Sequence, residues 1–524
     1  MVTIGAIERN EHEIMSAISK LPVWLCSLLL VPCLATGQDV NSKKQRADCN
    51  CSALFAGLVH KLEADYVGYK VAIKGKDETQ YSKHKQRLSE RAERASLNEC
   101  ILVLQDFVRF FRDGHLFVSE NPELSDEDVA RLTSSAEQTG RNEDSVRRQL
   151  AANLKRLDPI EGIWYDKDGH RFGIIRDRVM GRRDFVAILL SEGVDRWQVG
   201  QVKAEFRKLP DGSYTDVFYS GRHYPLHLAG YLRGETGGAA LRRNGLLLHM
   251  PPITWGKAFP LRESERGTID TSNPRRPTIR FLDQTTVVSI PSHSPEYAPL
   301  LKELIEKSRE RILKSENLIV DVRGDEGGSS WMTNVLMPFI VTAGKRPNRY
   351  WVGDHSVVLS SPDNISYFAQ MKSQGWIPEH LVERMQANPA RVVPFADPSP
   401  SQAAVTRNDV STVLPRNVAI LMDRAVVSAG EAFIIEAMRN EKVTLFGENT
   451  GGVIDYQSVT LVPIADCASA PYLGYPTSAA SDRLPVGGVN ATGIPPHVRI
   501  PDSIADPVAF IISYYKRHPT TQPK

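Results

Sequence analysis

The sequence predicts an α/β core with an N-terminal helical region and an inserted all-β domain, which is a small barrel or a sandwich. Three changes of pattern support this fold class. Apolar residues recur at helical spacing from about residue 51 to 111, short apolar runs divided by turn residues follow to about 257, and strands alternate with helices from about 278. With 524 residues, the chain is too long for one ordinary core, so two or three domains are expected.

The first forty residues have the pattern of a secretory signal. Lys20 precedes an apolar stretch from Leu21 to Leu34, and small residues follow at Ala35–Gly37. We assign residues 1–37 to a signal peptide and expect an exported protein, periplasmic or extracellular. Because the apolar stretch is short for a membrane span, no stable span is expected after cleavage; an uncleaved membrane anchor is the alternative.

Export makes disulfides possible for the four cysteines that would remain, which are Cys49, Cys51, Cys100 and Cys467. Pairing of Cys49 or Cys51 with Cys100 would tie two N-terminal helices together. Neither the cysteines nor the histidines have the spacing of metal ligands, so we assign no metal and no cofactor. The formal net charge is only +2, so we expect no nucleic-acid partner.

The N-terminal helical region is expected over residues 44–120. Two segments carry apolar residues at helical spacing: Leu54, Phe55, Leu58 and Leu62, and then Leu97, Ile101, Leu104 and Val108. The second helix ends in FFRDGHLFV (Phe110–Val118), where Gly114 stops the helix and HLFV predicts a strand. A polar stretch from about Glu120 to Leu157 predicts a linker or a surface helix.

The all-β domain is expected over residues 158–260. Runs such as GIWYDKDGHRFGIIRD and DFVAILLSEG are divided by Gly, Asp and Pro turns, and no long helical pattern occurs among them. This pattern is typical of a series of hairpins.

The α/β domain is expected over residues 278–518. Strands are predicted at TTVVSI, NLIVDVRG, VAILMD and KVTLFG, and helices at EYAPLLKELIEKSRERIL, Trp331–Val341 and Ala429–Met438. Sheets of this kind bind ligands beyond the carboxyl ends of their strands, and both Gly327-Gly328 and Ser428 fall just past such ends. The two loops together favour a functional site at this edge.

Ser428 lies at a strand-to-helix junction in DRAVVSAGEAFIIEAM (Asp423–Met438). A helix cap is one interpretation of a serine there. A nucleophile is the other, because the free N–H groups and the dipole of the helix stabilise a developing oxyanion. The glycine loop at the same edge favours the nucleophile. Glu431, in the first turn of the helix, is expected to complement the helix dipole.

Five motifs resemble, in order, those of the S41 serine peptidases, the family of C-terminal processing (tail-specific) proteases and tricorn core peptidases. They are FRDGHLFV, NLIVDVRGDEGGSS (Asn317–Ser330), VVSAGEAF, LFGENTGGV (Leu445–Val453) and GIPPHVRI (Gly493–Ile500). The resemblance covers the N-terminal helices and about Phe281–Tyr515. It implies a ClpP/crotonase-like layered arrangement of sheet and helices, and a secreted serine endopeptidase that acts on polypeptides.

Within the family, the chain is closer to the tricorn-like Ser–His subgroup than to the Ser–Lys subgroup. Val453 occupies the position of the basic Lys, and Lys442 comes too early. The Ser–His pattern has TxGGV in this loop and a His from the helical region; this chain has TGGV and His115. The resemblance therefore implies Ser428 as nucleophile and His115 as general base, a role that suits a neutral imidazole.

The group that orients His115 is left open by the sequence. The tricorn-like pattern has a Ser just before the His and a Glu three residues before the final Gly, and here Gly114 and Asn490 stand in those places. Asp113 is a nearby candidate, and Asp113, Asn490 and Gln457 are assigned as supporting residues.

The resemblance also implies an oxyanion hole made of backbone N–H groups. Ala429 follows the nucleophile, and Gly327 or Gly328 of DEGG would supply the second donor. Glycine suits this place because a side chain would block the substrate carbonyl.

Two other functions stay open. One is a catalytically weak or inactive S41-fold protein that binds a peptide or a hydrophobic ligand, which the missing carboxylate orienter of His115 favours. The other is a structural envelope protein that works through its β-domain. The hairpin string occupies the place of the PDZ domain usual in processing proteases, so selection of substrates by such a domain is not expected.

Overall fold

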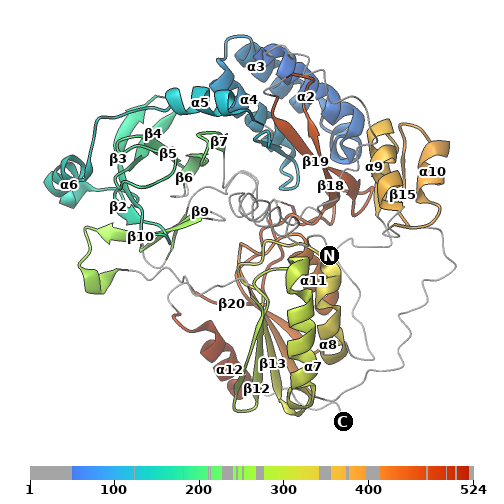
Figure 1. The fold of residues 1–524 in the computed structure, drawn as a ribbon. Coiled ribbons are helices and arrows are strands. Elements are labelled where there is room, and N and C mark those ends of the chain that lie inside the picture. The colour runs from blue at the N-terminus through green and yellow to red at the C-terminus, as the bar shows by residue number, and fades with distance from the viewer. Residues whose placement is uncertain are drawn as a thin grey trace, which may run out of the picture.

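The computed structural model shows three regions around a common centre (Figure 1). It describes residues 50–122, 124–180, 182–210, 212, 214–226, 240–242, 246–250, 253–266, 276–341, 356–372, 377–396, 414–467, 470–490, 492–501 and 504–518. The signal peptide expected at residues 1–37 lies outside these ranges. No helix in the described ranges combines the length and the apolar character needed to cross a membrane.

Three helices form the N-terminal region: α2 (Cys51–Asp65), α3 (Glu78–Ala92) and α4 (Leu97–Val108). The apolar residues that predicted α2 are all buried and pack in one cluster with residues of α4 and of the later strand β19. A disulfide joins Cys51 to Cys100, so the starts of α2 and α4 are tied together by one of the two pairings that the sequence left open. Cys467 is also disulfide-bonded.

After α4 the chain turns sharply and enters a second sheet. A short 3₁₀ turn (Arg109–Phe111) precedes Arg112, which is left-handed with φ 51°, and strand β1 (Phe117–Ser119) begins two residues after His115. Strand β1 pairs antiparallel with β19 (Tyr472–Ala479), which also pairs with β18 (Tyr456–Pro463) and β14 (Val357–Leu359). This pairing carries the His115 loop to the start of β18.

Helices α5 (Asp126–Ser134) and α6 (Glu143–Ala152) lead into an antiparallel sheet with the order β7-β6-β5-β4-β3-β2-β10-β9-β8. Its strands are β2 (Gly162–Tyr165), β3 (Arg171–Val179), β4 (Arg183–Leu189), β5 (Val202–Lys208), β6 (Tyr214–Tyr219), β7 (Pro225–Leu226), β8 (Ala240–Arg242), β9 (Leu247–Met250) and β10 (Ile253–Phe259). Phe172 and Trp255 stack in its core with ring centroids 4.2 Å apart. The predicted hairpins are present, but they form one curved sheet whose described pairing ends at β7 and β8.

The C-terminal region is a six-stranded sheet with the order β11-β12-β13-β16-β17-β20. Its strands are β11 (Thr278–Leu282), β12 (Thr285–Ser289), β13 (Asn317–Asp321), β16 (Asn417–Met422), β17 (Val443–Gly447) and β20 (Val498–Arg499). All neighbours from β12 to β20 are parallel, and β11 is antiparallel to β12. The carboxyl ends of β13 and β16 therefore meet at one edge.

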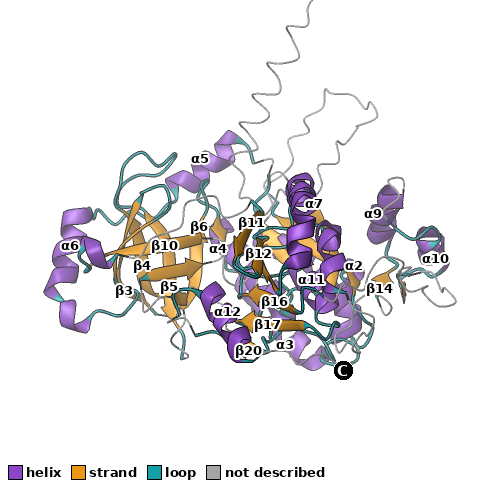
Figure 2. Cartoon of the chain, turned by 90° about the horizontal axis from the view of Figure 1, so that it is seen from below, coloured by secondary structure: helices purple, strands orange, loops and turns teal. Residues whose placement is uncertain are grey.

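Helices cover both faces of this sheet, with α7 (Ala298–Lys314), α8 (Met337–Ile340) and α11 (Ala429–Ala437) on one side and α12 (Pro507–Arg517) on the other (Figure 2). Successive residues of β13 point to opposite faces, so Leu318 and Val320 pack in the first layer and Ile319 in the second. Burial on both sides explains why these strands are apolar throughout.

One predicted helix is broken in the structure. Residues 331–341 form a 3₁₀ segment (Ser330–Leu336) followed by the short α8, rather than one α-helix. Pro338 stands in the first turn of α8, where its missing N–H costs nothing, whereas inside a continuous helix it would remove a hydrogen bond. Two further helices, α9 (Pro362–Lys372) and α10 (Leu381–Ala387), and strand β15 (Val392–Pro394) flank β14.

Candidate active site

Ser428 stands between the end of β16 and the start of α11, at the N-cap position of the helix. Its backbone has φ 54° and ψ −114°, a conformation that is costly for a residue with a side chain. Two hydrogen bonds hold it: its N–H donates to the Glu431 carboxylate at 3.2 Å, and its carbonyl accepts the N–H of Ala432 at 2.9 Å. The strained turn therefore presents the serine side chain in one fixed direction.

His115 lies beside this serine although the two are 313 residues apart in the chain. His115 Nε2 is 3.1 Å from Ser428 Oγ, and His115 Nδ1 is 2.5 Å from the backbone carbonyl of Tyr456. A carbonyl oxygen can only accept, so the proton of the neutral ring resides on Nδ1 and leaves Nε2 free to accept from the serine hydroxyl. Burial lowers the pKa of His115, and the hydrogen bond to Tyr456 opposes this shift. The neutral ring is therefore the form present near neutral pH.

The ring of His115 is oriented by a backbone carbonyl, whereas the sequence pointed to side chains. Asp113 does not bond to the ring: its Oδ1 accepts the backbone N–H of His115 at 2.9 Å, and its Oδ2 accepts the hydroxyl of Tyr66 at 2.8 Å. Burial raises the pKa of Asp113 to about 7, against the effect of these hydrogen bonds. Asp113 thus fixes the main chain of the loop that carries His115.

Asn490 and Gln457 support the segment that carries the Tyr456 carbonyl. Asn490 Oδ1 accepts the N–H of Asp455 at 3.1 Å, and Gln457 Nε2 donates to the carbonyl of Ile454 at 3.1 Å. Asn490 Nδ2 also reaches Asp113 Oδ1 at 3.5 Å. These two side chains therefore bond to the loop and not to the imidazole. The group that contacts the imidazole is the backbone carbonyl of Tyr456, which the sequence could not indicate because it is not a side chain.

The two glycines of the DEGG loop differ in how their amides are bonded. The N–H of Gly327 donates to Asp325 Oδ1 at 3.0 Å and is engaged within its own turn. For the amides of Gly328 and Ala429, no acceptor is found within the described ranges. A Cβ on Gly327 would lie 2.9 Å from the Cβ of Ser428, so the loop approaches the serine too closely for any side chain.

Glu431 connects the Ser428 turn to the TGGV loop, a role that its expected effect on the helix dipole did not predict. The side chain is fully buried and accepts hydrogen bonds from Thr450 Oγ1, Gly452 N (2.8 Å), Val453 N (2.7 Å) and Ser428 N (3.2 Å). Burial raises its pKa to about 7, while these four donors favour the charged form. Its role became visible only when the fold brought residues 450–453 to the helix.

A cavity of about 1930 Å³ lies behind the His115 loop. Helices α3 and α4 form one wall, strands β5 and β6 form another, and the floor reaches Asp113, Gly114, Gly452, Tyr456 and Asn490. The cavity therefore touches the segments that hold the imidazole.

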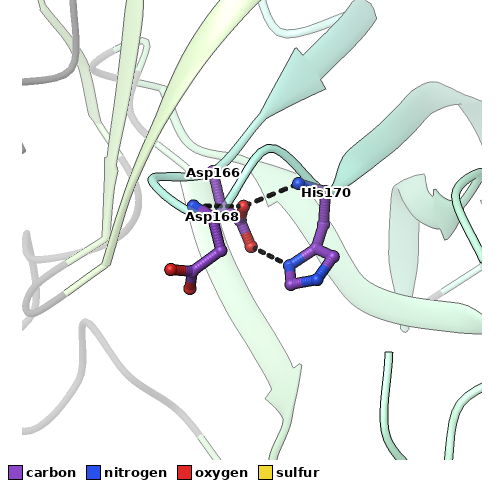
Figure 3. Close-up of side chains that lie close together, drawn as sticks. All are labelled: Asp166, Asp168 and His170. Carbon is purple, nitrogen blue, oxygen red and sulfur yellow. Dashed lines mark hydrogen bonds and ion pairs between the residues drawn. The ribbon is translucent and has the colours of Figure 1, made fainter. Parts of the chain in front are cut away.

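One group of side chains in the described ranges is close enough to share a metal ion, namely Asp166, Asp168 and His170 in the turn between β2 and β3 (Figure 3). Asp166 already accepts from the N–H of Asp168, the N–H of His170 and the His170 ring, each at 2.9 Å. These bonds account for the geometry of the turn, and we assign it no metal.

The sequence and the structure are similar to those of known peptidases. Residues 284–500 match the family model described as peptidase family S41. Mature CPAF is similar in structure, with 12% identity and a TM-score of 0.45 over 90% of this chain and 99% of that chain. The photosystem II D1 C-terminal processing protease has 13% identity and a TM-score of 0.35, over 88% of this chain and 96% of that chain. A putative S41 protease from Bacteroides fragilis NCTC 9343 has 11% identity and a TM-score of 0.33, over 92% of this chain and 100% of that chain. No curated protein matches the sequence.

Proposed function

Because the chain belongs, through residues 284–500, to peptidase family S41, we propose that it is a serine peptidase with Ser428 as nucleophile and His115 as general base. The observation that carries this proposal is the 3.1 Å contact between His115 Nε2 and Ser428 Oγ. The contact joins two distant segments, and the opposite ring nitrogen is bonded so that Nε2 is the acceptor.

The reaction follows from these contacts. As Ser428 Oγ attacks the peptide carbonyl carbon, its proton passes to His115 Nε2, and the carbonyl oxygen becomes an oxyanion held by the amides of Gly328 and Ala429. The C–N bond then breaks, and His115 returns the proton to the leaving amine. Water attacks the acyl-enzyme with His115 again as base, which releases the new carboxylate and restores the serine. Each oxyanion donor contributes roughly 3–4 kcal/mol, and the base accelerates the reaction roughly 10²–10⁴-fold.

A lysine base is disfavoured by the geometry. Val453, at the position expected for a lysine, is buried and donates its N–H to Glu431. Lys442 precedes β17, whose Val443 pairs with Val418 at the start of β16, whereas Ser428 follows the end of β16. Lys442 therefore lies at the opposite end of the sheet from the serine.

We further propose that the protein is exported and cleaves within polypeptide chains. The apolar stretch before residue 35 and the Cys51–Cys100 disulfide support export, because disulfides persist in oxidising compartments. Internal cleavage is read directly by mass spectrometry of the fragments produced from unfolded casein.

The decisive experiment is labelling of the purified protein with a fluorophosphonate, which forms a bond from phosphorus to Ser428 Oγ as fluoride leaves. We expect the wild type to be labelled, and both Ser428→Ala and His115→Ala to lose labelling. Lys442→Met and His518→Ala are the matched controls, and both should label like the wild type. An unlabelled but folded wild type would instead favour a protein that binds a peptide or hydrophobic ligand, and labelling that survives His115→Ala would assign the base elsewhere.

A further inference from the structure

Behind the glycine loop lies a histidine–aspartate pair that the reaction described above does not use. His293 follows β12, Asp325 follows β13, and neither side chain is exposed to solvent. His293 Nδ1 is hydrogen-bonded to Asp325 Oδ2. A buried carboxylate is costly unless its oxygens are satisfied, so the partners of this one show what it holds in place.

The carboxylate of Asp325 receives three donors from two segments. Its Oδ2 is bonded to the ring of His293, and its Oδ1 accepts the N–H of His293 at 3.1 Å and the N–H of Gly327 at 3.0 Å. Because the N–H of Gly327 is bonded to Asp325 within the same loop, it is not available to another acceptor. The next amide in the chain, that of Gly328, is the one left for an oxyanion.

The same pair is connected to the nucleophile turn. The carbonyl of Asp325 accepts the N–H of Val427, the residue before the serine, at 3.1 Å. Asp325 Oδ2 also lies 2.7 Å from the point where a Cβ on Gly430 would stand, so the carboxylate packs against the first turn of α11. A shift of Asp325 would therefore move the glycine loop relative to the serine.

Gly328 is held on its other side by the backbone of His293. The carbonyl of His293 accepts the N–H of Ser329 at 2.9 Å, and a Cβ on Gly328 would lie only 2.2 Å from that carbonyl oxygen. His293 thus contacts the loop twice, through its carbonyl and through its ring on Asp325.

We propose that His293 and Asp325 are a positioning pair that fixes the Gly328 amide against Ser428, an inference that rests on the proposed peptidase function. The ring nitrogen Nε2 of His293 is buried without a partner in the described ranges, so only Nδ1–H acts. One N–H donor at the Nδ1 position is therefore what the site requires. An asparagine amide can supply a donor there, whereas glutamine places its amide nearer to the Nε2 position.

The alternative is that Asp325 holds the turn alone. An aspartate commonly accepts the N–H two residues further along the chain, as Asp325 does with Gly327, without any help from a histidine. In that case His293 is a core residue whose loss lowers stability but leaves the chemical step unchanged.

The test compares wild type, His293→Leu, His293→Asn and His293→Gln by kcat and KM for p-nitrophenyl acetate, by the rate of fluorophosphonate labelling, and by the thermal unfolding midpoint. We expect His293→Leu to lose roughly 100-fold in kcat with KM changed less than about twofold, since small misplacement of catalytic groups costs this much. His293→Asn should recover to within roughly tenfold of the wild type, and His293→Gln should not. Leu301→Ala, in the same core but away from the loop, should lower the midpoint and leave kcat within about threefold.

Three results would overturn the inference: wild-type kcat in His293→Leu, equal rates in His293→Asn and His293→Gln, or an equal loss of kcat in Leu301→Ala at the same midpoint. If His293→Leu does not fold, the comparison of the Asn and Gln variants decides alone. A wild type that reacts with neither probe refutes the proposed function itself, and the positioning role falls with it. An active wild type with insensitive His293 variants refutes only the positioning role.

Discussion

The backbone carbonyl of Tyr456 accepts a hydrogen bond from His115 Nδ1 at 2.5 Å, directly opposite the contact from Nε2 to Ser428. A carboxylate in this place would stabilise the imidazolium that forms during the reaction, whereas a carbonyl offers only a partial charge. A carbonyl fixes the tautomer equally well. In the proposed mechanism, His115 is therefore an oriented base whose protonated form receives less stabilisation than in a Ser–His–Asp triad.

This arrangement predicts the pH dependence of the reaction. Burial lowers the pKa of His115, and a base must be unprotonated to accept the serine proton. We expect the labelling rate to rise with pH, to reach its plateau with an apparent pKa below about 6.5, and to fall roughly tenfold per pH unit on the acid side. The fluorophosphonate rate measured across the acid range checks this, and an inflection above the usual histidine range would contradict it.

The glycine loop predicts a clear difference between two alanine substitutions. In Gly328→Ala the new Cβ would lie 2.2 Å from the carbonyl of His293, so the loop must move away. We expect kcat to fall roughly 10²–10³-fold, the usual effect of losing an oxyanion donor. Gly324→Ala is the control for a positive φ, which is 78° there and 138° at Gly328, because no atom lies within 4 Å of its new Cβ. Equal losses in the two variants would show that strain alone is responsible.

The raised pKa of Asp113 predicts that its contribution to stability depends on pH in the direction opposite to that of most carboxylates. Burial raises its pKa from 3.8 to about 7, so the folded protein binds this proton more tightly than the unfolded chain does. The contribution to stability is fully present below the unfolded pKa and is lost as pH rises through about 7. Between about pH 5 and about pH 8 the wild type should lose about 2–3 kcal/mol from this group.

The substitution Asp113→Asn removes the charge and retains an oxygen for the N–H of His115. Urea unfolding at the two pH values should show a smaller loss of stability in this variant than in the wild type. Parallel pH dependence in the two proteins would mean that Asp113 is ionised throughout.

The Cys51–Cys100 disulfide closes a loop with a sequence separation of 49 residues between helices that position His115. In the chain-entropy view, a loop of this length contributes about 4 kcal/mol to the free energy of unfolding. We expect Cys51→Ala/Cys100→Ala to lower stability by about that amount in urea unfolding. The double substitution is preferable to a reductant, because Cys467 is also disulfide-bonded. Unchanged stability would show that helix packing alone holds the region.

The sequence predicted the elements that carry their own pattern. Apolar periodicity located α2 and the parallel strands, and family motifs singled out Ser428 and His115, which the fold brings into contact. The strand order of the β-rich sheet could not be predicted from the sequence. Strand β2 pairs with both β3 and the distant β10, and no local pattern specifies that second pairing.

The parts of the site that the sequence missed depend on backbone atoms or on distant loops. Tyr456 contacts His115 through its backbone carbonyl, which every residue has, so the identity of the residue at 456 did not predict the contact. Gly327 and Gly328 are the same residue type, so the sequence could not distinguish them, whereas the structure shows the N–H of Gly327 bonded to Asp325. Of the four partners of Glu431, Ser428 is local, and the three in residues 450–453 become its neighbours only in the folded chain.

The pairing of β1 with β19 makes the placement of His115 depend on residues that are synthesised late. His115 lies just before β1, which pairs with Tyr472–Gly474 of β19. Chains are made from the N-terminus, so His115 is synthesised first, then Ser428, and only afterwards strand β19. A chain that lacks Tyr472–Gly474 therefore cannot form the strand pairing that precedes the contact between His115 and Ser428 in the structure.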